Sequence, residues 1–198
     1  MSKAPELIIV KQREFATTYW EVWYKSFDNF SALNLQNSSA KYTNGGWHTV
    51  FSSNATNFSV GQEFNGYSNA GAKNVTYAFH SVPGFSKIGT YSGNGSTDGP
   101  FVHAGFRPKY VMVKRMDATE EWMILDSARD PMNGAKARLF AQDTMVENPA
   151  ETMDFLSNGF KLRRGGGGTG NVSGGTYLYV AFAEAPFGGS GVAPATAR

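Results

Sequence analysis

Residues 5–11 read Pro-Glu-Leu-Ile-Ile-Val-Lys, and residues 108–114 read Pro-Lys-Tyr-Val-Met-Val-Lys. Two more pairs of segments recur in the same order, offset by 102 or 103 positions: Trp20–Trp23 with Trp122–Leu125, and Ala78–Pro83 with Ala181–Pro186. Three matching blocks in one order indicate an internal duplication. Because the blocks are rich in β-branched and aromatic residues, each half is predicted to be one β-rich unit.

The composition also favours strands over helices. Aromatic residues make up 14% and charged residues 17% of the 198 residues, and there are 23 glycines. The sequence has no long stretch rich in Ala, Glu, Lys and Leu that would form a helical bundle. We therefore predict an all-β protein built from two pseudo-repeated antiparallel units, each with a β-sandwich or jelly-roll-like fold.

Charge, cysteine content and hydropathy exclude several classes of protein. The formal net charge is only +2 and the basic residues are scattered, which leaves no electrostatic footprint for nucleic acid. The absence of cysteine excludes disulfides and thiolate metal sites. No apolar run reaches the roughly 18 residues of a membrane span, and residues 1–5 lack the apolar core of a secretion signal. We expect cytoplasmic synthesis and no membrane insertion.

The repeated blocks predict the main strands. Each half is expected to open with a β-hairpin, because short polar stretches separate its first two apolar runs. The strands of these hairpins are Leu7–Lys11, Trp20–Ser26, Tyr110–Lys114 and Glu121–Asp126. The segments 75–82 and 176–185 are apolar on both faces, which predicts central strands that end at Pro83 and Pro186.

Two local signals lie in the polar middle of the second half. Asn158-Gly159 stands between Phe155 and Phe160, which predicts a tight β-hairpin turn. A short helical turn is expected within residues 148–156. Together these elements divide the chain into a first β unit (1–83), a joining hairpin (84–107), a second β unit (108–187) and an extended C-terminal arm (188–198).

Several segments resemble the repeat domain of tail-fibre-like virion proteins of tailed bacteriophages, many of them marine. The segments that carry the resemblance are Gly84–Val102, Gly105–Pro108, Val111–Arg115, Asp126–Arg129, Asp154–Phe160 and Ala181–Phe187. The resemblance implies a non-enzymatic structural protein of the virion, most similar to a tail-fibre protein for host recognition or fibre assembly. An alternative is a capsid decoration or head-fibre protein, and a third is a carbohydrate-active enzyme.

The implied setting also gives the expected partners. These are other virion proteins, further copies of the chain in a homo-oligomer, and a glycan of the host surface. The protein would be located in the virion after synthesis in the host cytoplasm. No cofactor is expected.

Candidate metal and phosphate sites are weak in this sequence. His48, His80 and His103 stand far apart, without the spacing of metal ligands. Residues 94–98 place oxygens at alternate positions, as a calcium loop does, but lack its later bidentate carboxylate, so a turn with side chains bonded to its own backbone is preferred. The run Gly165–Gly168 lacks the following Lys-Ser or Lys-Thr of a phosphate loop, which favours a flexible loop tip.

A hydrolytic site would need paired carboxylates or a nucleophile beside a base. Asp126, close in sequence to Arg129 and Asp130, forms the densest charged group, and Glu184 lies on a predicted central strand. We interpret Asp126 and Arg129 as a structural ion pair, so no catalytic residue is assigned.

Aromatic side chains are the remaining signal, because they can stack on sugar rings. Most are expected in the core. Trp23 lies on the strand face opposite Trp20, and Trp47 lies in a predicted loop. Trp23 and Trp47 are therefore the candidate contacts for a glycan or receptor.

The two halves differ in one respect that bears on assembly. The first half has no counterpart of residues 85–102, which precede the second half. If this segment completes a sheet, the first unit exposes an unpaired strand edge, a template for pairing with another chain. We expect the arm 188–198 or a neighbouring virion protein to cover an edge, and the isolated protein to self-associate.

Overall fold

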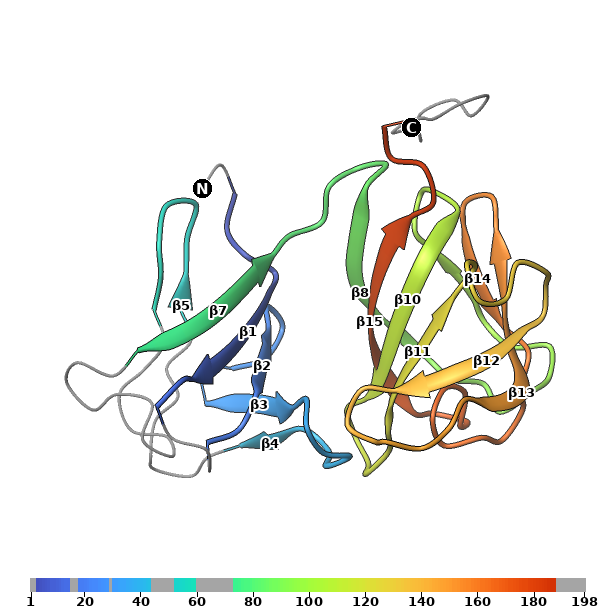
Figure 1. The fold of residues 1–198 in the computed structure, drawn as a ribbon, viewed down its shortest axis with the longest axis horizontal. Coiled ribbons are helices and arrows are strands. Elements are labelled where there is room, and N and C mark those ends of the chain that lie inside the picture. The colour runs from blue at the N-terminus through green and yellow to red at the C-terminus, as the bar shows by residue number, and fades with distance from the viewer. Residues whose placement is uncertain (1–2, 15–17, 29, 44–51, 60–72, 188–198) are drawn as a thin grey trace. The chain divides into compact units, whose positions relative to one another are not determined.

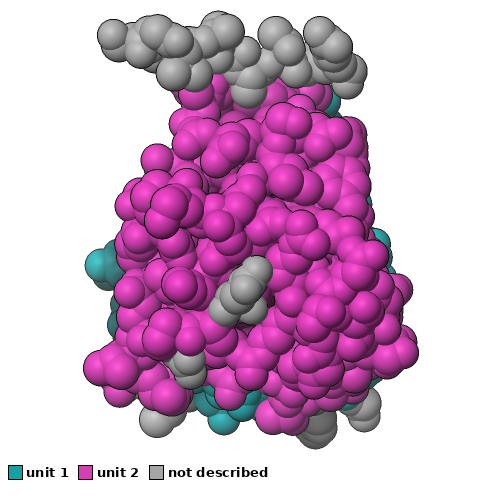
Figure 2. All heavy atoms as spheres, turned by 90° about the vertical axis from the view of Figure 1, so that its right-hand side faces the viewer, with its two compact units in different colours: residues 1–80 teal, residues 81–198 magenta. Residues whose placement is uncertain are grey.

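The repeated apolar blocks lie in strands of two antiparallel sheets in a computed structural model. The structure describes residues 3–14, 18–28, 30–43, 52–59 and 73–187. All regular elements in these residues are β-strands, which confirms the predicted all-β class. The chain divides into two compact units, Met1–His80 and Ser81–Arg198, shown in different colours in Figure 2.

Unit 1 contains a five-stranded antiparallel sheet in the order β4-β3-β2-β1-β7 (Figure 1). Its strands are β1 (Leu7–Gln12), β2 (Glu21–Tyr24), β3 (Ser31–Asn34), β4 (Tyr42–Thr43) and β7 (Asn74–Phe79). A separate two-stranded sheet pairs β5 (Ser52–Ser53) with β6 (Phe58–Ser59). The buried residues of these strands include Ile8 and Val10 on one face of the sheet and Val22 on the other, so both faces are covered at β1 and β2.

Unit 2 contains eight antiparallel strands in the order β8-β15-β10-β11-β12-β13-β14-β9. The strands are β8 (Ser86–Ser92), β9 (Phe101–His103), β10 (Pro108–Arg115), β11 (Trp122–Asp126), β12 (Ala135–Phe140), β13 (Asn148–Leu156), β14 (Gly159–Leu162) and β15 (Thr176–Ala183). The sheet curls until it is nearly a barrel (Figure 1). Its two end strands, β8 and β9, are not paired with each other.

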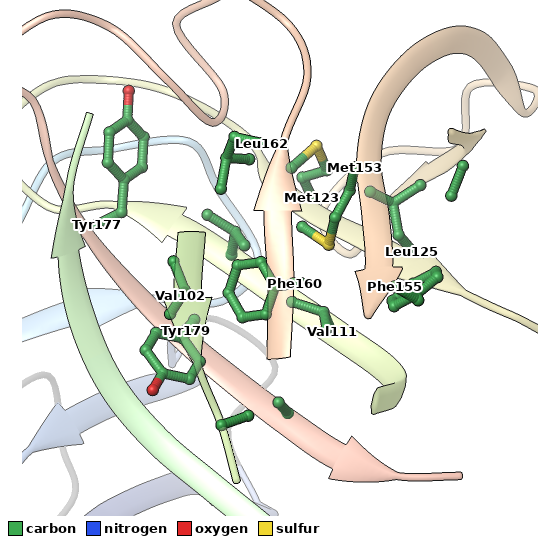
Figure 3. Close-up of a cluster of buried hydrophobic side chains, with 14 of the residues drawn as sticks. Val102, Val111, Met123, Leu125, Met153, Phe155, Phe160, Leu162, Tyr177 and Tyr179 are labelled. Carbon is green, nitrogen blue, oxygen red and sulfur yellow. The ribbon is translucent and has the colours of Figure 1, made fainter. Parts of the chain in front are cut away.

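The inside of this curled sheet holds the hydrophobic core of unit 2. Figure 3 shows core side chains from β9, β10, β11, β13, β14 and β15 converging. Aromatic contacts join β15 to β8 and to β14: Tyr91 stacks on Tyr177 with ring centroids 5.0 Å apart, and Phe160 contacts Tyr179 edge-on with centroids 5.3 Å apart. Such contacts add to the area that the rings bury, so this cluster is a main source of stability.

Four strands of each unit pair in the same order and register. Strands β7-β1-β2-β3 correspond to β15-β10-β11-β12. Leu7 lies opposite Tyr24 and Phe79, and Tyr110, its counterpart, lies opposite Asp126 and Phe182. These pairs map onto one another with the offsets seen in the sequence, so the repeated blocks form equivalent hydrogen-bonded ladders.

The correspondence extends to a side chain that caps the second strand of each hairpin. The backbone N–H of Trp20 donates to Gln36 Oε1 at 2.7 Å, and the N–H of Trp122 donates to Gln142 Oε1 at 2.9 Å. A buried backbone donor must find an acceptor, and both units supply the same kind of residue. This glutamine pair is not evident from the sequence, because the two residues are separated by a larger offset than the repeated blocks.

Three expectations differ from the structure. Strand β7 lies at the edge of its sheet, although its apolar character predicted a central strand; Tyr77 on this strand is 49% exposed. The predicted joining hairpin 84–107 instead supplies β8 and β9, which pair with β15 and β14 at opposite ends of unit 2. The helical turn expected within 148–156 is wrong, because pairing with β12 and β14 makes this segment a strand despite its local propensity.

The Asn158-Gly159 hairpin is confirmed, with Phe155 opposite Phe160 and Leu156 opposite Gly159. Strand β9 packs closely against this turn. A Cβ atom added at Gly159 would lie 2.1 Å from the carbonyl oxygen of Val102. Only glycine therefore fits where β14 begins.

Replacing Gly159 with alanine should destabilise unit 2 by roughly 3 kcal/mol, because the backbone of β9 must move to admit the methyl group. The measurement is the free energy of unfolding from denaturant titration. Ser157→Ala is the matched control, since Ser157 is exposed beside the same turn. Equal stability of the two variants would contradict the close contact with Val102.

Candidate functional site

The predicted glycan contacts are not both on the surface. Trp23 is only 5% exposed, and all four residues of β2 are buried. The prediction for Trp23 is therefore wrong. Side-chain alternation distinguishes the two faces of the strand, but both faces of β2 are covered. Trp47 lies outside the described residues. Exposed aromatic side chains are found instead at Tyr19, Phe30, Tyr77, Phe101 and Phe187.

Asp126 and Arg129 form the predicted ion pair, with Arg129 Nε 2.6 Å from Asp126 Oδ2. The other carboxylate oxygen accepts the backbone N–H groups of Ala128 and Arg129 at 3.1 and 2.9 Å. Burial raises the pKa of Asp126, but the hydrogen bonds and charge of Arg129 outweigh it, so the pKa lies below its usual value. The carboxylate holds the turn after β11 in place.

The other carboxylate considered for catalysis is also engaged in an ion pair. Glu184 Oε2 lies 3.0 Å from Arg107 Nε, and both side chains are partly exposed. The arrangement offers two salt-bridged carboxylates where a hydrolase would need an acid and a base facing one groove.

The turn predicted at residues 94–98 is confirmed. Asn94 Oδ1 accepts the backbone N–H of Ser96 at 3.0 Å, and Ser96 Oγ accepts that of Asp98 at 3.0 Å. Asn171, which is buried, joins this turn to the β14–β15 connection, since its Nδ2 donates to Ser96 O at 2.7 Å and its Oδ1 accepts the N–H of Asn94 at 2.9 Å. Sequence reasoning missed Asn171 because its partners are more than 70 residues away.

The glycine run 165–168 lies beside a small hollow, which Gly167 helps to line. The lining contains Arg164 from this loop and Arg138 from β12. Burial lowers the pKa of Arg138, and the charge of Arg164 lowers it further. The sequence did not indicate that these arginines line one hollow, because the pairings of β12 with β13 and of β13 with β14 place them there. Carbonyl oxygens of the loop are occupied, as Tyr177 donates to Gly168 O at 3.0 Å.

The two corresponding sets of four strands, β7-β1-β2-β3 and β15-β10-β11-β12, differ most clearly at the outer edge of β7. In unit 2 the corresponding strand, β15, is covered by β8 along its whole length, from Thr176 opposite Ser92 to Phe182 opposite Ser86. No strand of the described residues pairs with β7 on the side away from β1. Residues Asn74 and Ala78 of this strand are exposed. Among the described residues of unit 1, the outer edge of β7 is therefore open at the position where unit 2 has a partner strand.

The family model described as Domain of unknown function (DUF7483) matches residues 1–186. The chain belongs to this family. No curated protein and no solved structure matches it.

The described part of this DUF7483 chain contains neither a membrane-spanning helix nor a cluster of metal ligands. None of its segments there forms a helix of the length and apolar character that crossing a membrane requires. Groups of three or more His, Asp or Glu side chains placed to hold a metal ion are also lacking in those residues.

The interior face of unit 1 contains a buried acid where unit 2 has an apolar residue. Glu21 lies opposite Val10, and its counterpart Met123 lies opposite Val113. Tyr42 donates a hydrogen bond of 3.1 Å to Glu21 Oε1, but no described residue is bonded to Oε2. Burial raises the pKa of Glu21 to about 8, although the Tyr42 hydrogen bond opposes the shift. Glu21 is thus protonated at neutral pH.

The raised pKa makes the stability of unit 1 depend on pH. Between the unfolded value of 4.5 and the folded value of about 8, the folded state binds more protons, so the free energy of unfolding falls as pH rises. Since one pKa unit corresponds to about 1.4 kcal/mol, the total loss reaches several kcal/mol. Below pH 4.5 the stabilisation is fully present.

Glu21→Gln should remove this pH dependence and raise the unfolding temperature at pH 9, because glutamine stays neutral when buried. Thermal unfolding followed from pH 4 to pH 9 measures the effect. Glu14→Gln, on an exposed glutamate of the same unit, is the control and should keep the wild-type slope. Parallel pH profiles of wild type and Glu21→Gln would refute a raised pKa.

Proposed function

We propose that the chain is a non-enzymatic structural protein of a tailed-phage virion, of the tail-fibre type, acting in host recognition or fibre assembly. The observation that carries the proposal is the open edge of β7, at the position where β8 covers the equivalent strand of unit 2. Open strand edges pair readily with other chains, and assembly proteins use such pairing. The salt-bridged state of Asp126 and Glu184 supports a role without catalysis.

The shared four-strand ladders support a duplication in which each unit is a version of one sandwich-like module. In this proposal, unit 2 completes its module with β8, β9, β13 and β14, and unit 1 completes its own through assembly. The partners are other virion proteins and further copies of the chain, and the location is the virion. Trp47 remains the candidate contact for a host-surface glycan.

The location on the particle tests the proposal directly. Antibodies against the full chain should label intact phage particles along the tail fibres. Gold particles seen by electron microscopy give the position. Label confined to the capsid would favour the alternative, a decoration or head-fibre protein, and unlabelled particles would refute a virion role.

A mutation of Asp126 tests the structural role of its carboxylate. Asp126→Ala should destabilise unit 2 by roughly 1–2 kcal/mol, because Arg129 and two backbone N–H groups lose their acceptor. Asp143→Ala, which removes the single backbone bond to Met145, should cost less. The measurement is the denaturant midpoint.

The same variant tests the absence of catalysis. Neither the wild type nor Asp126→Ala should release sugar from host polysaccharide, as judged by chromatography of the products. Sugar release that the substitution abolishes would establish the chain as a carbohydrate-active enzyme.

A further inference from the structure

We propose that the open edge of β7 binds an extended strand with the side-chain pattern of β8, supplied by another protein chain. This inference rests on the proposed assembly role and names the chemistry of the partner. Three observations support it. These are the register of β8 on β15, the backbone N–H and C=O groups of β7 that point away from β1, and the side chains beside those groups.

The register of unit 2 defines where the incoming strand would lie. Tyr179 pairs with Gly89 and Val180 with Ile88. The counterparts of Tyr179 and Val180 in unit 1 are Thr76 and Tyr77, because Val10 lies opposite Thr76 as Val113 lies opposite Tyr179. An incoming strand in this register places one residue against Thr76 and its neighbour against Tyr77.

The backbone of β7 is oriented to receive such a strand. The N–H of Arg13 donates to Lys73 O at 2.9 Å, and in unit 2 the N–H of Met116 donates to Thr176 O at the same distance. Alternation along an antiparallel strand then directs the N–H and C=O groups of Asn74, Thr76 and Ala78 away from β1. Their counterparts in β15 are the residues that face β8. Three residues therefore offer both a donor and an acceptor.

Side chains beside this edge favour an apolar residue on one face of the strand. Tyr77 is half-exposed and is held by stacking against Trp20, with ring centroids 6.4 Å apart. In unit 2 the equivalent cross-strand pair is Val180 with Ile88, and both side chains are buried. An apolar side chain placed against Tyr77 would gain a similar contact.

On the opposite face of the sheet, the edge of β7 differs from that of β15 in the side chain that an incoming strand would contact. A Cβ atom at Gly89 would lie 2.9 Å from the ring of Tyr179, so β15 accepts only glycine there without moving this ring. Thr76 has no ring. The edge of β7 should therefore accept a larger residue at that position, and a β-branched one would add strand propensity.

A synthetic peptide exploits this difference. It has the sequence of residues 85–93 with Gly89→Val and carries a fluorescent label. Valine at this position hinders displacement of β8 from β15, so binding reports the edge of β7. The full chain should bind the peptide saturably in fluorescence anisotropy. A second peptide with Gly89→Pro lacks the central N–H and is the control that should not bind.

Two variants of the chain test the location of the site. Thr76→Pro removes an outward N–H without breaking a bond to β1, and it should weaken binding by about tenfold or more. Thr76→Val keeps the backbone donor and a side chain of similar shape, and it should bind as the wild type does. Hydrogen exchange at the amides of Thr76 and Ala78 should slow when the peptide is added to wild type. That measurement decides the outcome if Thr76→Pro does not fold.

The outcomes separate this inference from the proposed function. Peptide binding that Thr76→Pro leaves unchanged, or wild type that neither binds nor gains amide protection, would overturn it. A concentration-dependent dimer that excludes the peptide would show that a second β7 occupies the edge, and would also overturn it. Antibody labelling of the particle is independent of all these results, so the virion role can fail while strand binding succeeds, or the reverse.

Discussion

The two units depend on one constraint, the backbone hydrogen bonding that pairs a central strand with a neighbour on each side. Strand β1 is paired on both sides, by β2 and β7, and β10 is paired by β11 and β15. A shift of one residue in either ladder would turn every side chain to the opposite face. The matching registers therefore preserve the buried faces even where the residues differ, as at Glu21 and Met123.

Much of this framework could be predicted from the sequence, because it consists of local apolar blocks with a clear turn signal. The repeated segments predicted β1, β2 and β7 and their counterparts β10, β11 and β15, and Asn158-Gly159 predicted the β13–β14 hairpin. Asp126 and Arg129 are three residues apart, so their ion pair was also within reach of local reasoning. An unpaired edge in the first unit was an expectation from comparing the two halves, and no strand of the described residues of unit 1 takes the position that β8 has in unit 2.

The remaining features depend on contacts between distant segments, which periodicity does not encode. Pairing with β12 and β14 makes 148–156 a strand. Pairing with β15 and β14 places β8 and β9 at opposite ends of one sheet. Trp23 could not be assigned to the core because alternation identifies two faces without saying how many are covered. Asn171 bonds to a turn more than 70 residues away, and Arg138 and Arg164 line one hollow because strand pairing brings β12 near the segment that follows β14.

The place of β8 in the chain shows where unit 2 begins relative to the repeated blocks. This strand follows β7 in the sequence, yet it completes the sheet of the unit that comes after it. A cut before Pro108, where the second repeated block begins, would separate unit 2 from its own edge strands, whereas a cut at the boundary after His80 would keep them. The start of the second repeated block and the start of unit 2 thus do not coincide, because β8 and β9 precede the block in sequence but belong to the same unit.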